Sequence, residues 1–205
     1  MRALDGRASP RQRMISAVAV ASVFVFGGAA AHAESDRPAI EQKLQQSGAG
    51  LSADAAHALT RGETQILFAI VDDRAVAPVV RGRAVTSLGW VRSAAAHDFL
   101  ENLIIRKLPS SDAGDRLLLR KAAVALGWQS GPRVVDTLAP LLEHVDPDVR
   151  LDAAVGLGLS RNHAAEQPLR DRLTREDDAN VRRQLETQLR QLASASTAGH
   201  PPEHR

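Results

Sequence analysis

One ten-residue pattern recurs along the chain and constrains its fold more than any other feature. Each clear copy begins with an apolar residue, which Arg follows in two of the three. Small residues fill the second half of the pattern, and Leu-Gly ends it. The clear copies are residues 80–89, 118–127 and 149–158, and a copy without the glycine is 181–189. Units that recur every ~30 to 40 residues are typical of solenoid proteins, in which each unit buries its apolar face against its neighbours.

A second helix is expected after each copy, because apolar residues recur there at one common offset. They lie 8, 12 and 16 positions after the leucine that ends the first helix, which places them on one stripe of a helix. The triplets are Leu67/Val71/Ala75, Ala96/Leu100/Ile104, Val134/Leu138/Leu142 and Ala165/Leu169/Leu173. We therefore predict an all-α fold, a right-handed α-solenoid of antiparallel helix pairs with about four and a half repeats.

Composition agrees with close-packed helices in one domain of ordinary size. The chain has 205 residues, no Cys, no Tyr and 3% aromatic residues, so its apolar content is chiefly Ala, Leu and Val. Without Cys the chain forms no disulfides, and its core must stabilise the fold alone.

The first 33 residues are predicted to be an export signal. Four arginines precede an apolar run at 14–26, and Ala31-His32-Ala33 before Glu34 fits a cleavage site between Ala33 and Glu34. The alternative is an uncleaved anchor, but the run at 15–31 contains two glycines and is short for a spanning helix. We expect a periplasmic or secreted protein without stable membrane insertion after cleavage.

Removal of the signal changes the charge balance. The leader holds four basic residues and one acidic residue, which leaves 22 Lys and Arg against 23 Asp and Glu in residues 34–205. The basic character belongs to the segment that is removed, so no electrostatic case for binding nucleic acid remains.

The rest of the chain divides into an N-terminal cap or arm at 34–50, a repeat domain at 51–193 and a disordered tail at 194–205. Residues 51–60 are expected to be a degenerate first copy, and 181–192 a polar-faced terminal cap. The longer interval between the first two clear copies predicts a loop at 109–114.

Residues within the unit have predicted structural roles. Paired alanines allow close helix approach, and the glycine after the last leucine is expected to end the first helix in a left-handed cap. Asp146-Pro147-Asp148 is expected to start a helix. The repeat-core residues are Leu88, Gly89, Leu126, Gly127, Leu157 and Gly158.

Two sets of side chains that recur in register allow two interpretations each. Trp90 and Trp128 follow the glycine and could form a platform for an aromatic ligand or a partner, but Leu159 at the third place favours a packing role. The arginines that recur near the start of the first helix could bind an anion, although capping of carbonyls or pairing with acids is favoured. These arginines are Arg81, Arg150 and Arg182.

The pattern V-R-x-x-A-A-x-A-L-G with its striped second helix resembles the HEAT-like repeats of the phycobilisome-lyase type, over about residues 51–192. The resemblance implies a non-catalytic scaffold in most cases, and in a minority a bilin lyase, an iron-dependent hydroxylase or a DNA glycosylase. The hydroxylases carry His-Glu dipeptides, whereas this chain has only the reversed Glu143-His144 and Glu203-His204. The glycosylase needs a basic groove, so the bilin lyase remains the alternative.

No catalytic or metal-binding constellation, and no cofactor, is predicted from the residues. The chain has no Cys nucleophile and no Gly-rich phosphate loop. No pair at i and i+3 or i+4 occurs among the histidines outside the leader and the tail. These are His57, His97, His144 and His163. His97 and His163 hold similar places near second helices, so a shared ligand role is the alternative to solvated turn residues.

A partner-binding face is predicted on the second helices, opposite the apolar triplets. Its polar residues are Asp73, Asp98, Asn102, Asp136, Gln167 and Asp171, next to Ala69 and Pro140. A mildly acidic ridge of this kind would bind a basic or peptide-like partner, and an ordinary solvated face is the alternative. We therefore expect an exported, non-catalytic scaffold that binds another protein, with a bilin-lyase-like or other ligand-handling enzyme as the alternative.

Overall fold

The computed structural model describes residues 27–59, 61–131 and 133–198, and these residues form helices and connecting turns without any strand. The helices are α1 (Gly27–Gln46), α2 (Ala53–His57), α3 (Arg61–Asp72), α4 (Pro78–Leu88), α5 (Ala94–Lys107), α6 (Ala113–Gln129), α7 (Val134–Leu138), η1 (Ala139–Glu143), α8 (Pro147–Leu159), η2 (His163–Ala165), α9 (Glu166–Leu173) and α10 (Ala179–Ala198). The prediction of an all-helical repeat fold is confirmed.

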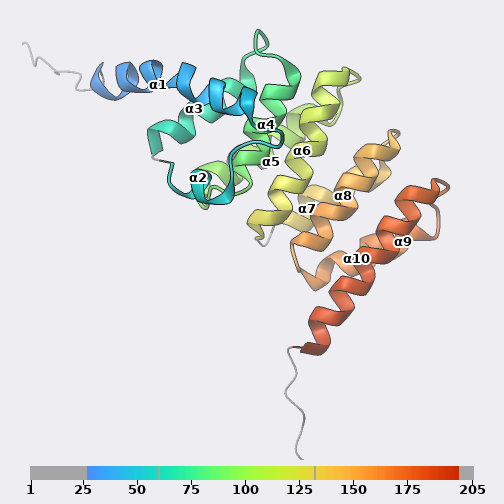
Figure 1. Ribbon diagram of the computed structural model, residues 1–205. Helices are drawn as coiled ribbons and strands as arrows, with labels where there is room; N and C mark the ends of the chain where they lie inside the picture. Colours follow the sequence, from blue (N-terminus) through green and yellow to red (C-terminus); the bar gives the residue numbers. More distant parts are fainter. Residues whose placement is uncertain (1–26, 60, 132, 199–205) are drawn as a thin grey trace, which may run out of the picture.

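The helices are arranged in two layers. Figure 1 shows the first helices α4, α6, α8 and α10 side by side in a row, with the second helices α5, α7 and α9 behind them. The most extensive contacts join neighbours in the front row, α4 with α6, α6 with α8 and α8 with α10, and each second helix also packs on the next first helix. Each helix pair therefore buries its apolar side against the next pair, as a solenoid requires.

The predicted stripes of the second helices form the core between the layers. Ten of their twelve positions are buried, and Leu173 is partly buried against the same core. Ala75 is the exception, because α3 ends at Asp72 and leaves Ala75 exposed in the turn that leads to α4. In the third pair, α7 gives way to η1 around Pro140, yet Leu142 remains 1% exposed.

Helix starts follow the predicted chemistry. The Asp112 carboxylate accepts a hydrogen bond from the Asp115 N–H at 2.8 Å, and the Asp146 carboxylate accepts one from the Asp148 N–H at 2.9 Å. Asp112 caps α6, so the loop covers 108–112, and the last two residues of the segment predicted as loop already belong to the helix.

The prediction of left-handed glycine caps is wrong. Gly127 and Gly158 lie inside α6 and α8, and Gly89 has a right-handed φ of −60°. The non-glycine residues with a left-handed φ in the described part of the chain lie three positions after the helical glycines, at Ser130 (φ 54°) and Arg161 (φ 52°).

The glycines instead allow neighbouring first helices to touch. A Cβ atom on Gly127 would lie 2.6 Å from the Cα atom of Gly156 on α8. A Cβ atom on Gly89 would lie 2.8 Å from the Trp128 ring. Such distances are shorter than van der Waals contact, so the front row requires glycine at these places.

The first and last described helices, α1 and α10, each cross a boundary predicted from the sequence. α1 runs without a break through Ala33 and Glu34, and its Ile40 and Leu44 are buried where α1 packs on α3 and α4. The predicted cap at 34–50 thus docks on the core, whereas residues 1–26 of the predicted signal lie outside the described residues. α10 continues to Ala198, so 194–198 of the predicted tail are helical, and 199–205 lie outside the described residues. Among the described helices, none has the length and hydropathy needed to cross a membrane.

Candidate functional site

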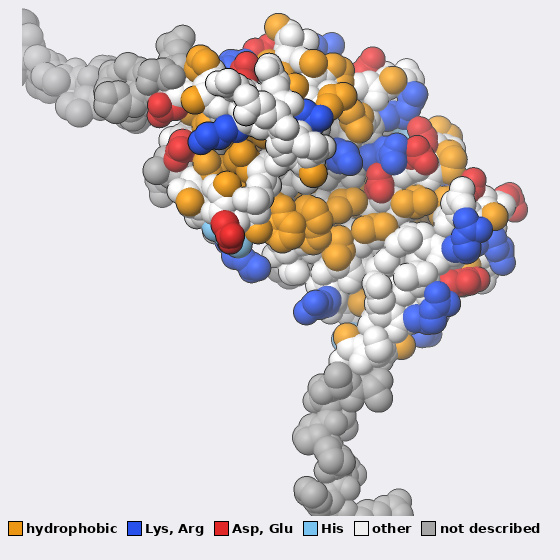
Figure 2. Space-filling model, in the orientation of Figure 1, with side chains coloured by type: hydrophobic (Ala, Val, Ile, Leu, Met, Phe, Trp, Pro, Cys, Tyr) orange, Lys and Arg blue, Asp and Glu red, His pale blue; other side chains and the backbone are white. Residues whose placement is uncertain are grey.

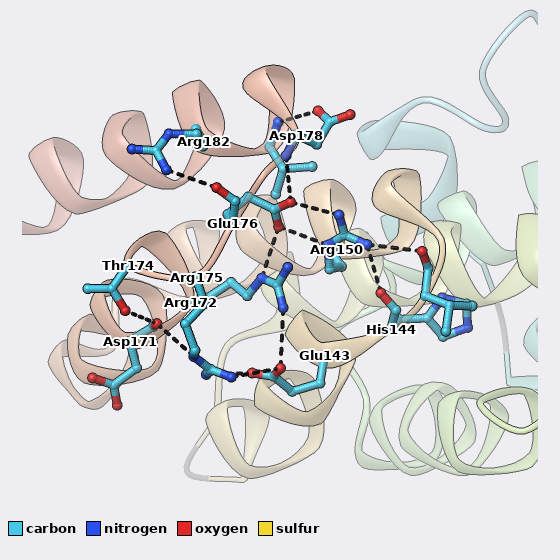
Figure 3. A network of polar contacts seen from close by, with 12 residues as sticks. Glu143, His144, Arg150, Asp171, Arg172, Thr174, Arg175, Glu176, Asp178 and Arg182 are labelled. Carbon is cyan, nitrogen blue, oxygen red and sulfur yellow. Dashed lines mark hydrogen bonds and ion pairs between the residues drawn. The ribbon is translucent and has the colours of Figure 1, made fainter.

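A buried bidentate ion pair joins Arg150 on α8 to Glu176 in the turn between α9 and α10. Arg150 Nε donates to Glu176 Oε2 at 2.8 Å and Arg150 Nη2 donates to Oε1 at 2.7 Å, which is a bidentate pair (Figure 3). The side chains are 10% and 0% exposed. Arg150 Nη1 also donates to the carbonyl oxygens of His144 and Val145 at 2.9 and 3.1 Å. One guanidinium therefore connects the turn before α8 to the turn before α10.

The charge of Glu176 is stabilised in the folded protein. The hydrogen bonds from Arg150 lower the pKa of this carboxyl to about 2, although burial opposes the shift. Arg172 contributes with a bond of 2.9 Å from Nε, and the Asp178 N–H with another of 2.9 Å. With these donors around Glu176, the network holds repeats together and offers no open anion site.

The arginines at equivalent positions have the same structural role. Arg81 Nε donates to the Val71 carbonyl oxygen at 2.7 Å, and Arg182 Nη1 donates to the Glu176 carbonyl oxygen at 2.8 Å. The interpretation as carbonyl caps and acid partners is confirmed for these residues. Between α6 and α8, Arg120 adds ion pairs of 2.7 Å with Asp148 and with Asp152.

The histidines of the described residues lie apart in separate turns and helices. His97 Nε2 lies 3.3 Å from Glu101 Oε1, and His163 Nδ1 lies 3.0 Å from Glu166 Oε1. His144 Nδ1 accepts a hydrogen bond from the Asp146 N–H at 3.0 Å. The described part of the chain contains no group of three side chains that could hold a metal ion.

The structure places most of the predicted second-helix residues on the surface, but it also places cations beside two of them. The placement of Asp73 on a helix is wrong, because α3 ends at Asp72 and Asp73 lies half-buried in the turn that follows. Asp73 pairs with Arg37 of α1, which lowers the pKa of its carboxyl. Asp98 lies 3.2 Å from Arg133 Nη2. The other members of the face, Asn102, Asp136, Gln167 and Asp171, are exposed. The Gln167 side-chain amide donates a hydrogen bond of 2.8 Å to the Asp171 carboxylate. The ridge is therefore less acidic than its sequence predicts, because arginines about 35 positions away in the sequence pair with Asp73 and Asp98.

A different surface gathers partly exposed apolar side chains on the first helices, and we call it the apolar ladder. It consists of Trp90 after α4, Val124 and Trp128 on α6, and Val155 and Leu159 on α8. The Trp90 and Trp128 rings stack with centroids 4.3 Å apart and planes inclined by 22°. Figure 2 shows hydrophobic side chains gathered over α6 and α8, between the N-terminal helices and α10.

The ladder follows the repeat register. Trp90, Trp128 and Leu159 each follow the glycine of a unit, and Val124 and Val155 lie one helical turn before the last two. The packing role predicted for the tryptophans is confirmed in part, because Trp90 packs against the core and Trp128 stacks on Trp90, but both rings also remain partly exposed. The signal that could have revealed the surface was the pair of valines in register, since they lie on the same helix face as the residues after the glycines.

Two arginines border the ladder at its ends. Arg92 and Arg161 lie two residues after Trp90 and after Leu159, and both are exposed. Among the described residues, neither guanidinium has a carboxylate within ion-pair distance. Arg92 lines a hollow of about 280 Å³ together with Gln129, and Arg161 lines one of about 470 Å³ together with Leu159.

Comparison with known proteins agrees with the repeat architecture. Residues 108–190 match the family of HEAT repeats, which covers the helices from α6 through most of α10. The match is to HEAT repeats in general and does not distinguish the phycobilisome-lyase type. No curated protein matches the chain significantly. The match and the all-helical fold together support a HEAT-like repeat family.

Proposed function

We propose that the protein is an exported, non-catalytic scaffold that binds another protein through the front row of its helical array. The apolar ladder is the observation that carries this proposal. Two stacked tryptophans and three aliphatic side chains remain partly exposed at equivalent places of successive repeats. Aromatic and aliphatic side chains gathered in this way are typical of protein-binding surfaces, where tryptophan commonly supplies much of the binding energy.

The use of the buried charges supports a scaffold over an enzyme. Arg81, Arg150 and Glu176 are each occupied by carbonyl, amide or ion-pair partners that connect turns. HEAT repeats commonly mediate protein–protein interaction, and stacked repeats create extended binding surfaces. Export rests on the sequence of the first 33 residues, in which a basic leader and an apolar run precede Ala33-Glu34.

Photo-crosslinking in intact cells tests the proposal. A photoreactive amino acid at Lys121, which is exposed one turn before Val124, should yield a discrete adduct with one protein in the extracytoplasmic fraction. The N-terminal sequence of the protein in that fraction should begin at Glu34. The matched control carries the same group at Asn102, exposed on α5 of the other layer, and should yield much less adduct.

Three results would count against the proposal. Adducts only at Asn102 would move binding to the second helices, and no protein adduct at either position would contradict a scaffold. A coloured or tightly bound small molecule that co-purifies with the protein would favour the ligand-handling alternative.

A further inference from the structure

We propose that the apolar ladder, with Arg92 and Arg161 at its ends, binds an acidic amphipathic helix of the partner protein. This inference rests on the proposed function, because it takes the ladder as the partner-binding surface and adds the chemistry of the segment that fits it.

The two ends of the ladder carry positive charge. Arg92 and Arg161 are exposed and lack carboxylate partners among the described residues. Among the other exposed arginines, Arg106 and Arg170 have one (Asp72 at 3.1 Å and Glu166 at 2.9 Å), whereas Arg74 and Arg183 have none within the described residues. The position beside the ladder, and not the lack of pairing alone, therefore distinguishes Arg92 and Arg161. Lys121 adds a further exposed cation beside the ladder. Figure 2 shows Lys and Arg side chains along the lower edge of the hydrophobic patch. Carboxylates of a partner would complement this edge.

The backbone conformation of Arg161 is unusual for a non-glycine residue. Its φ of 52° lies in the left-handed region, which glycine and asparagine adopt more easily than arginine. No hydrogen bond or ion pair of its side chain within the described residues compensates for this conformation. Ser130, at the equivalent place of the preceding repeat, has a φ of 54°, so the turn after the first helix accounts for this backbone, and Arg161 adds an exposed guanidinium there that can contact a partner.

The shape of the ladder suits a helix laid across it. The ladder crosses from α4 to α8, and hollows of about 280 and 470 Å³ lie beside its two ends. An amphipathic helix presents apolar side chains at i, i+3 or i+4 and i+7, about 5.4 Å apart per turn. Laid across the ladder, such a helix can cover the tryptophan pair and Val155 with its apolar stripe and direct acidic residues to Arg92 and Arg161.

Other occupants fit the charge less well. The first 33 residues of the chain carry four arginines and one aspartate, so this segment would place cations against Arg92 and Arg161. In a symmetric dimer through the same face, the ladder would be covered, but both copies would bring their unpaired guanidinium groups into one interface. A separate acidic segment satisfies both the apolar and the basic groups.

Binding of three designed helical peptides to the purified full-length protein tests the inference. The first has a leucine stripe and glutamates, the second has the same stripe with lysines, and the third has the glutamates with serines in place of the stripe. Fluorescence anisotropy at low ionic strength should show saturable binding of the first peptide only, and the affinity should fall as salt rises.

Two variants assign the binding to the proposed residues. The double variant Arg92→Gln/Arg161→Gln should weaken binding of the acidic peptide about tenfold, because two charge-assisted contacts are lost. Val155→Asp should weaken it further, because it interrupts the stripe and repels the glutamates. The matched control Arg106→Gln/Arg170→Gln makes the same charge change at exposed second-helix sites and should bind as the wild type does.

The outcomes separate this inference from the proposed function. Equal or tighter binding of the lysine peptide, or unchanged binding by the Arg92→Gln/Arg161→Gln variant, would overturn the acidic-helix proposal. A concentration-dependent dimer in sedimentation that Val155→Asp abolishes would assign the ladder to a second copy and also overturn it. An adduct at Lys121 in cells with a protein other than a second copy would still support the scaffold in these cases.

Discussion

Replacing Glu176 with Gln is expected to lower the free energy of unfolding by about 3 to 5 kcal/mol, because the change leaves the Arg150 guanidinium buried without its anion. The pair is bidentate, and its side chains are 10% and 0% exposed, so water cannot replace the lost carboxylate. Urea denaturation at neutral pH measures the effect. Glu143→Gln is the matched control, since Glu143 is 52% exposed and pairs with Arg172 and Arg175. It should cost no more than about 1 kcal/mol. Equal losses in the two variants would contradict the assigned role of the buried pair.

The same pair predicts a dependence of stability on pH. The Glu176 carboxyl has a pKa of about 2 in the folded protein and an ordinary value of 4.5. A lowered folded pKa contributes stability that is present above pH 4.5 and is lost as the pH falls toward 2. The shift corresponds to about 3 kcal/mol. In Glu176→Gln this part of the acid sensitivity should disappear, and a wild-type slope retained in the variant would contradict the assignment.

Replacing Gly127 with Ala is expected to destabilise the protein by about 3 kcal/mol or more, because the added methyl group overpacks the contact between α6 and α8. A Cβ atom there would meet the backbone of Gly156, which cannot move aside as a flexible side chain could. The loss should appear as a lower midpoint in urea without a change in helical content of the folded state.

Gly82→Ala is the matched control for this experiment. Gly82 is also buried in a first helix, α4, but the atoms nearest to its added methyl group would be side-chain atoms of Leu117 and Lys121, at an ordinary contact distance of 3.7 Å. Because alanine is a better helix former than glycine, this variant should be neutral or more stable by up to about 1 kcal/mol. A loss in Gly82→Ala as large as that in Gly127→Ala would contradict the close-contact role of the repeat glycine.

The core was predictable from the sequence because burial in a helix follows local spacing. Leu100, Leu138 and Leu169 lie at one offset from their first helices, and all three are fully buried. Ala75 was misplaced because the turn from Asp72 to Pro78 ends the helix, and an alanine in register gives no sign of that stop.

The repeat glycine shows why residue type alone does not give a role. Glycine serves both left-handed caps and close helix contacts, and both uses place it near the end of a first helix. The use of Gly127 depends on how closely α6 approaches Gly156 of α8, about 30 residues further along the chain. The sequence of a single repeat unit does not contain this distance.

Charges on the surface depend in the same way on distant residues. Periodicity correctly placed Asp98 on the exposed side of its helix, but its partner Arg133 is 35 residues away in the next repeat. The carbonyl-capping arginines were easier to predict, because Arg81 reaches Val71 within ten residues. The partly exposed ladder was missed because its members are apolar, and apolar residues in register are more often core.

The circular dichroism of the two tryptophans tests most directly the central claim that equivalent positions of successive repeats lie side by side. Trp90 and Trp128 are the only tryptophans, the chain has no tyrosine, and the rings stack at 4.3 Å across adjacent first helices. Indole rings this close should give an exciton couplet in the far ultraviolet. We expect Trp90→Phe and Trp128→Phe each to abolish the whole couplet, while the helical signal is retained. If each variant instead removed about half of the tryptophan signal, or if no couplet appeared in the wild type, the side-by-side arrangement of the repeats would be contradicted.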